Sequence, residues 1–289
     1  MKVALILTGH MRDWQEVYPT IREEILVKYD VDVYISSFDH NLDSIRQEGD
    51  IVDDREKDTE KIDLKEIKHY YQPVKSIFRS NNYELDFNFN KIVNERIPRE
   101  WAKRNIQKWE TVYLSLKIIN LKKYDVIIRS RPDIFIKNLE IDPNKNLVFP
   151  HLCIDPGPCT INEGLYPHFV YGKPEYMKKY LEVYTKLQEM HSKGMTDISV
   201  REITLKDYVK NYIGMENIYI DENIEWKYHD QVWSSDLKSV HSIIQADNPE
   251  GWLLDGSMDE KLFDSIMSST EMDESNLDGA CIDCLPTSP

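Results

Sequence analysis

The chain has 289 residues, of which 41% are hydrophobic and 30% are charged, which is enough apolar material for a folded core. Its 36 Lys and Arg residues and 51 Asp and Glu residues give a net charge of −15, whereas nucleic-acid binding needs a basic surface. The same acidity excludes an electrostatic anchor on anionic lipid. We therefore expect no nucleic-acid partner, but a basic pocket for a small phosphate is compatible with this charge, because net charge does not describe a single cleft.

Two features indicate a soluble protein in a reducing compartment. The first apolar run, Val3–Leu7, is too short for the core of a signal peptide or for a membrane span. The four cysteines are too few for a disulfide framework. The sequence thus predicts a cytoplasmic protein without integral membrane contact.

The first elements follow a strand–helix–strand order. The continuous run Val3–Leu7 is typical of a strand buried on both faces, and a Thr-Gly-His sequence follows it at residues 8–10. Apolar residues then recur at helical spacing over 14–29, and a second strand is expected over 31–37. This order predicts parallel strands whose C-terminal ends gather the connecting loops at one edge.

The same alternation continues along the chain. Residues 41–68 are highly charged and predict a solvated loop that leads into a short helix. A strand over 75–78, a helix over 101–121 and a strand over 126–136 that Pro132 interrupts come next. The remaining expected elements are strands over 147–150, 169–172, 218–228 and 240–244 and helices over 174–191 and 200–213.

The last part of the chain differs in composition. Residues 258–289 contain eight acidic side chains and one lysine. Such a segment has too few apolar residues to pack a core. The sequence therefore predicts a single α/β domain over 1–257, followed by an acidic, disordered tail over 258–289.

The residues after the first strand, Thr8–Arg12, form the first candidate site. Gly9 carries no side chain that would keep a ligand away, and the next helix offers free backbone N–H groups to a phosphate. Arg12 can pair with a diphosphate. The further glycines of a dinucleotide fingerprint and the Gly-Lys-Ser/Thr of a Walker loop are missing. A glycine that serves only the strand–helix turn is the structural alternative.

The second candidate site is Arg129-Ser-Arg-Pro-Asp133, at the end of a later strand. Two arginines and a carboxylate are costly to bury unpaired. One interpretation is an Arg–Asp ion pair that holds a bent strand end. The other is a pocket in which Arg129 and Arg131 face phosphate oxygens and Asp133 holds Mn²⁺ or Mg²⁺, since such cations are bound by one or two carboxylates together with substrate phosphates.

Together these segments resemble a group of proteins assigned as glycosyltransferases, which are related to WavE-type lipopolysaccharide-synthesis proteins and occur in bacteria and large DNA viruses. The resemblance covers roughly residues 2–185. It rests on Thr8–Arg12, the helix around Gln107 and Trp109, Tyr124–Asp133, and Phe169–Gly172 followed by Met177 and Tyr180. It implies a GT-A-like, Rossmann-like fold, with a mostly parallel central sheet flanked by helices.

The resemblance also implies a function. A sugar would pass from a nucleoside diphosphate sugar, with a UDP-sugar favoured, to a carbohydrate or glycan acceptor. If the chain is viral, this would take place in the host cytoplasm. The residues that would bind the donor are Thr8, Gly9, His10, Arg12, Arg129, Arg131 and Asp133.

Metal and base positions follow from the same resemblance. In GT-A folds an Asp-x-Asp-type motif at a strand end binds the metal and the diphosphate; here only Asp133 supplies a carboxylate there, and His229 is a candidate second ligand. The family tends to carry an Asp before its Phe-x-x-Gly segment, where this chain has Pro167–His168. In a GT-A enzyme the loop over 155–163, together with His168, would line the acceptor side, so the resemblance implies Asp155 and Glu163 as candidates for a general base.

Two alternatives from other functional classes remain open. One is a non-catalytic α/β module that binds a nucleotide or a nucleotide sugar. The other is an interaction protein that recruits a basic partner through its acidic tail. Donor hydrolysis or sugar transfer separates the first alternative from the enzyme.

Overall fold

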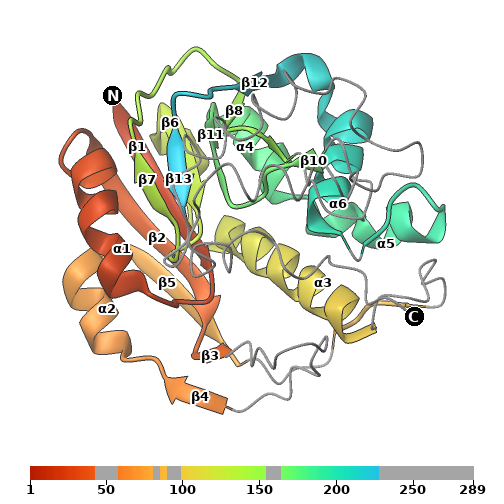
Figure 1. Ribbon diagram of the computed structural model, residues 1–289, viewed down its shortest axis with the longest axis horizontal. Helices are drawn as coiled ribbons and strands as arrows, with labels where there is room; N and C mark the ends of the chain where they lie inside the picture. The colour runs from red at the N-terminus through yellow and green to blue at the C-terminus, as the bar shows by residue number, and fades with distance from the viewer. Residues whose placement is uncertain (43–57, 81–84, 90–98, 154–163, 199, 228–289) are drawn as a thin grey trace, which may run out of the picture.

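The computed structural model describes residues 1–42, 58–80, 85–89, 99–153, 164–198 and 200–227 (Figure 1). At its centre lies a seven-stranded sheet. The strands, from one edge to the other, are β12 (Ile218–Ile220), β8 (Leu147–Phe149), β11 (Phe169–Gly172), β6 (Val126–Ser130), β1 (Lys2–Gly9), β2 (Asp30–Phe38) and β5 (Lys75–Arg79). All of them run in one direction except β11, which is antiparallel to both of its neighbours. The expected mostly parallel sheet is confirmed.

The central strand β1 shows why a continuous apolar run forms a strand here. Val3, Leu5 and Leu7 pack into the core on one face of the sheet, and Ala4 and Ile6 pack into the core on the other. Successive side chains of a strand point to opposite faces, so a strand covered on both sides needs apolar residues at every position. The run 3–7 therefore has strand character without alternation.

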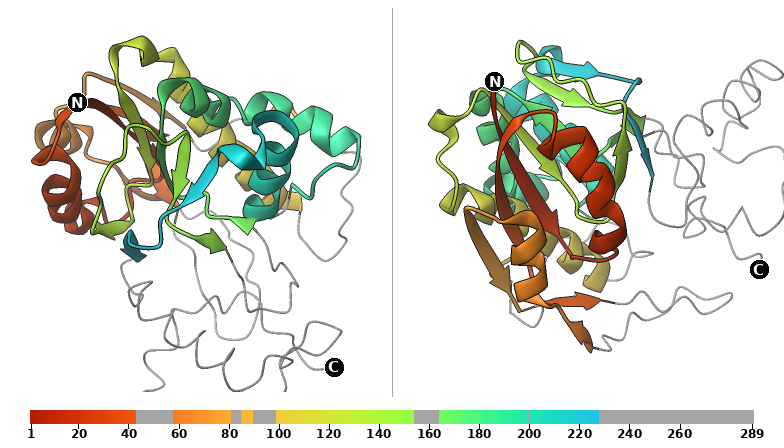
Figure 2. Two further views of the ribbon diagram at one scale, coloured as in Figure 1. Left: turned by 90° about the horizontal axis from the view of Figure 1, so that it is seen from above. Right: turned by 90° about the vertical axis from the view of Figure 1, so that its left-hand side faces the viewer.

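Helices cover both faces of the sheet, as the GT-A-like, Rossmann-like arrangement requires. One face carries α1 (Trp14–Ile21), its π-helical continuation η1 (Arg22–Leu26), α2 (Leu64–Tyr71) and the antiparallel pair of β7 (Phe135–Lys137) and β13 (Glu225–Lys227). The other face carries α3 (Arg99–Leu114), α4 (Pro174–Leu181), α5 (Tyr184–Ser192), α6 (Arg201–Tyr208) and its π-helical continuation η4 (Val209–Ile213). The right-hand view of Figure 2 looks onto the face of α1 and α2.

The expected helices over 101–121 and 174–191 are not continuous α-helices. The helix over 101–121 ends at Leu114, where the Ser115 hydroxyl donates to the Val112 carbonyl at 2.6 Å and competes with the helical hydrogen bonds. The 3₁₀ turns η2 (Ser115–Lys117) and η3 (Leu121–Lys123) follow. The helix over 174–191 divides into α4 and α5, because the chain leaves regular α-geometry at Glu182.

The interrupted strand over 126–136 is two strands in different sheets. The ladder of β6 ends at Ser130, and Pro132, which has no N–H to donate, follows. The chain then turns away, and β7 pairs with β13 outside the main sheet. The expectation of one strand that resumes after the proline is therefore wrong.

Short strand pairs and one turn complete the described fold. The ends of the expected loop over 41–68 contribute to an antiparallel pair, β3 (His40–Leu42) with β4 (Asp58–Lys61), so these residues are not all loop. A second pair joins β9 (Leu152–Cys153) to β10 (Gly164–Leu165), and the 3₁₀ turn η5 (Met215–Asn217) precedes β12.

Several predictions fall outside the described part of the chain. These concern the strand over 240–244, the domain boundary at 257 and the acidic tail over 258–289, which stay predictions. Among the helices that the structure describes, none combines the length and the apolar character needed to cross a bilayer.

The close approach of β11 to β8 generates a stability prediction at Gly172. A Cβ atom at this position would overlap with the carbonyl oxygen of Asn146, which is backbone and cannot rotate away. We expect Gly172→Ala to lower the free energy of unfolding by about 1–3 kcal/mol or more, the usual range for overpacking. Denaturant unfolding measures the change.

Gly194→Ala is the matched control. Gly194 has a positive φ of 67°, but a Cβ atom there meets nothing within 4 Å. Its replacement should cost only the left-handed backbone term, about 1–2 kcal/mol. A Gly172→Ala protein as stable as the wild type would show that β8 and β11 separate easily.

Candidate functional site

The candidate site lies at the C-terminal edge of the sheet, where three segments meet. β1 pairs in parallel with β6, with Leu7 opposite Ser130. Thr8 and Gly9 continue β1 beyond this pair and remain paired with β2, and Gly9 lies beside Arg131. Because β11 is antiparallel, its first residue Phe169 is also opposite Ser130. Pro167 and His168 therefore lie at the same edge, as ligand-binding segments of open α/β sheets do.

A narrow pocket at this edge is strongly cationic. Its lining includes five Lys or Arg side chains, although the whole chain has a net charge of −15. The space open to the centres of water molecules is about 30 Å³. These five residues are Arg12 after β1, Lys108 on α3, Arg129 and Arg131 at the end of β6, and Arg201 at the start of α6.

Arg129 joins the three strands at the base of the pocket. Its Nε donates to the hydroxyl oxygen of Thr8 at 2.6 Å, and its Nη1 donates to the carbonyl of Pro167. The hydroxyl of Tyr180 donates to the same carbonyl at 3.3 Å. Arg129 and Thr8 are both buried. Thr8 thus positions Arg129 without lining the pocket, whereas Gly9 and His10 line the pocket itself.

The carboxylate of Asp133 is bound on both oxygens by Arg131. Nε of Arg131 donates to Oδ1 at 2.8 Å, and its Nη2 donates to Oδ2. The carboxylate side chain is 6% exposed, and the guanidinium side chain is 16% exposed. This bidentate arrangement is the Arg–Asp ion pair of the first interpretation, which involves Arg131 rather than Arg129.

His168 is held in a defined protonation state. Burial and the positive charges of Arg131 and Arg201 lower the pKa of its imidazole well below its ordinary value. Nδ1 lies 3.2 Å from Nη1 of Arg131, which can only donate, so Nδ1 accepts and carries no proton. The proton is assigned to Nε2, which points to a carboxylate oxygen of Glu202 at 3.9 Å.

Lys108 is surrounded by like charges. Its half-buried side chain lies on the face of α3 that closes the pocket. Burial lowers the pKa of its ammonium group well below the ordinary value of 10.5, and nearby guanidinium groups lower it further. These groups belong to Arg201, Arg131, Arg12 and Arg104.

Gly9 and His10 shape the side of the pocket next to β2. Gly9 has a φ of 113°, a conformation that side chains rarely adopt, and its carbonyl accepts a hydrogen bond of 2.6 Å from the hydroxyl of Ser37. The ring of His10 stacks on Phe38, with ring centroids 4.6 Å apart. These contacts hold the backbone at the end of β1 in place without a ligand.

The described residues do not by themselves fit a divalent cation. Both oxygens of Asp133 already accept from Arg131, and the described part of the chain holds no group of three or more His, Cys, Asp and Glu side chains suited to a metal. The other candidates, Asp155, Glu163 and His229, lie outside the described residues. Their roles, and that of Asp133 as a ligand, stay predictions.

Three residues of the site were not singled out as donor-binding residues from the sequence. Lys108 and Arg201 belong to helices, and His168 was noted as a departure from the family pattern and as part of the expected acceptor side. One signal for Lys108 was present: Arg104 and Lys108 are four residues apart on one helix, and like charges at this spacing destabilise a helix. A nearby anion would relieve this repulsion.

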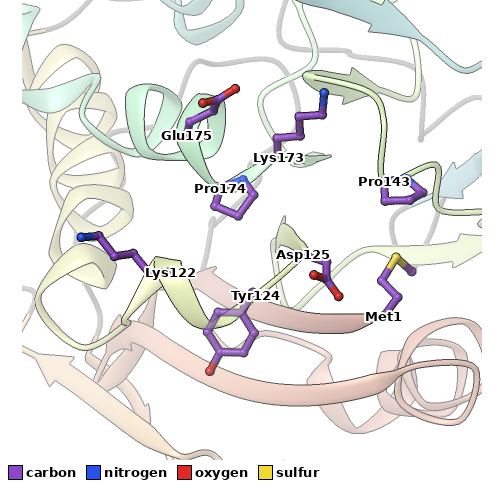
Figure 3. A pocket seen from close by; sticks show the side chains of 8 residues that line it. All are labelled: Met1, Lys122, Tyr124, Asp125, Pro143, Lys173, Pro174 and Glu175. Carbon is purple, nitrogen blue, oxygen red and sulfur yellow. The ribbon is translucent and has the colours of Figure 1, made fainter.

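A second, larger depression lies at the opposite edge of the sheet. Figure 3 shows the residues that line it, among them Met1, Asp125 and Lys173, and its volume is about 730 Å³. Its charges are mixed, and one oxygen of Asp125 accepts from the backbone N–H of Lys2 at 2.7 Å. It also faces the N-terminal ends of the parallel strands, away from the usual ligand edge.

The likeness of this chain to known proteins is limited. No protein-family model matches the chain, and no curated protein matches it. Among solved structures, the chain is similar to core-mannan synthase A (CmsA/Ktr4) from Aspergillus fumigatus, in its Mn/GDP form, with 10% identity and a TM-score of 0.41 over 80% of this chain and 75% of that one. A likeness of this degree does not transfer an activity, so the pocket must support any functional proposal.

The bidentate pair generates a prediction for Asp133→Asn. The amide keeps the volume but removes the charge that compensates Arg131, so the free energy of unfolding should fall by about 1.5–3 kcal/mol, as for a hydrogen bond to a charged group. Thermal and denaturant unfolding measure the loss. Unchanged stability would show that the pair contributes nothing and would favour Asp133 as a metal ligand.

Replacement of Lys108 should stabilise the protein, whereas replacement of Asp133 should destabilise it. Because the folded state lowers its pKa, the folded protein binds fewer protons than the unfolded chain between that lowered pKa and pH 10.5, and the fold is destabilised at and below these pH values. We expect Lys108→Met to raise the melting temperature at neutral pH, with the gain shrinking as the pH approaches 10.5. Lys103→Met, on the same helix but outside the pocket, should show no such gain. A lowered melting temperature for Lys108→Met would contradict this account.

Proposed function

We propose that the chain is a glycosyltransferase that moves a sugar from a nucleoside diphosphate sugar to a carbohydrate or glycan acceptor. The observation that supports this most is the meeting of five cationic side chains beside the backbone of Gly9. They lie at the C-terminal edge of a mostly parallel sheet, where open α/β folds bind ligands. The resemblance of Thr8–Arg12 and Tyr124–Asp133 to glycosyltransferase segments points the same way.

The chemistry of sugar transfer explains why such a pocket is useful. The oxygen of an acceptor hydroxyl forms a bond to the anomeric carbon, while the bond from that carbon to the diphosphate oxygen breaks. The electron pair stays with the nucleoside diphosphate, which gains negative charge in the transition state. Arg12, Lys108 and Arg201 line the pocket and would stabilise that charge, which is commonly a large part of enzymatic rate acceleration.

Other parts of the proposal rest on the sequence. Asp155 or Glu163 is proposed to take the proton of the acceptor hydroxyl, and a UDP-sugar is the favoured donor. A divalent cation would supply further charge stabilisation, with Asp133 and His229 as its candidate ligands. The contact of Asp133 with Arg131 weighs against this ligand set, and no step above depends on it.

A ligand screen with one pair of variants tests the proposal. UDP, GDP and their sugars should raise the melting temperature by mass action, and one nucleotide sugar should be hydrolysed or used for transfer. Arg12→Gln should weaken that binding by roughly tenfold or more, as expected for loss of a charged partner. Arg22→Gln, an exposed arginine outside the pocket, should bind like the wild type.

The outcomes separate the candidates. Binding that depends on Arg12 but leads to neither hydrolysis nor transfer, with any acceptor supplied, favours the non-catalytic nucleotide-binding module. Failure of every nucleoside diphosphate and nucleotide sugar to bind, with or without metal, rejects the proposal.

A further inference from the structure

The pocket brings together five Lys and Arg side chains of like charge. Asp133 is bound by Arg131, and Glu202 lies 3.9 Å from both Arg201 and His168, beyond the distance of a direct hydrogen bond. Within the described part of the chain, neither Lys108 nor Arg201 makes a direct hydrogen bond to a carboxylate. Like charges in a half-buried pocket repel one another strongly, because the local dielectric constant is lower than that of water.

The arginines at the base of the pocket already serve the fold. The hydrogen bonds described above direct Arg129 to Thr8 and Pro167, and Arg131 to Asp133 and His168. These contacts orient the two guanidinium groups and make them part of the wall. Lys108 and Arg201 approach the same space from α3 and α6, on the other side.

We infer that a phosphate group of the donor is held in this pocket by Lys108 and Arg201, with Arg12 as a third cation, and that this binding does not depend on a divalent metal ion. The inference rests on the proposed function, because it names how that function's donor is bound. It also departs from the metal-dependent binding that the sequence predicts, since the carboxylate expected to hold the metal is bound to Arg131 on both oxygens.

The dimensions and charges agree with a phosphate group as the occupant. A space of about 30 Å³ for water centres holds roughly two water molecules, so it admits a phosphate group and not a nucleoside. An anion there would replace repulsion among the cations by attraction. It would also favour the protonated form of Lys108 and so raise the pKa that the neighbouring guanidinium groups lower.

Isothermal titration calorimetry on the full chain tests the inference. UDP, GDP and inorganic diphosphate are titrated in EDTA and, separately, with Mn²⁺. We expect the bound nucleotide and the diphosphate to have the same affinity under both conditions. Lys108→Met and Arg201→Gln should each weaken binding by roughly tenfold or more. Lys103→Met on α3 and Lys206→Gln on α6, both outside the pocket, should leave it unchanged.

The melting temperature of each unliganded variant distinguishes lost binding from lost folding. Lys108→Met should melt no lower than the wild type while it binds more weakly, a combination that a merely structural lysine would not produce. The inference is overturned if both pocket variants keep wild-type affinity, or if Lys108→Met and Arg201→Gln both lose binding only together with a melting temperature several degrees lower.

The ligands separate this inference from the proposed function. Nucleotide binding that requires Mn²⁺ overturns the inference and leaves the glycosyltransferase proposal in place. Diphosphate binding in EDTA without binding of any nucleotide supports the cationic anion site and contradicts the nucleotide donor. If neither ligand binds under either condition, both are rejected.

Discussion

The buried guanidinium group of Arg129 is the contact on which the candidate site depends. It belongs to β6 and donates to a hydroxyl on β1 and to a carbonyl just before β11, so it connects three neighbouring strands where they leave the sheet. Both acceptors are neutral, so these two bonds orient the group without neutralising it. A buried arginine tolerates this position only with well-placed acceptors. The positions of Gly9, Arg131 and His168 around the pocket follow from this connection.

The sequence predicts much of this arrangement because strand ends follow simple rules. Val3–Leu7 and Val126–Ile128 are continuous apolar runs, which indicates buried parallel strands, and parallel strands gather their following residues at one edge. That is why residues 8–12 and 129–133 could be recognised as candidates. Lys108 and Arg201 could not be recognised in this way. The periodicity of a helix shows which of its faces is apolar, but it does not show which of its polar residues lies near the end of a distant strand.

Asp133 shows a different limit of sequence reasoning. An Arg-Pro-Asp sequence at a strand end is compatible with a metal ligand and with an ion pair, since both uses place the carboxylate at the same edge. Only the turn of the chain at Pro132 brings the guanidinium of Arg131 onto both carboxylate oxygens. The antiparallel direction of β11 was equally hidden, because Phe169–Gly172 is apolar throughout and carries no mark of its direction.

That direction has a consequence for how the protein can be altered. β8 runs parallel to β6 and ends at Phe149, whereas β11 begins at Phe169, so the connection between them leaves and returns at the same edge of the sheet. The chain does not need to cross the sheet here, and the length of this connection is not set by the strands. Insertions between the paired strands β9 and β10 would thus leave the strand register of the main sheet unchanged.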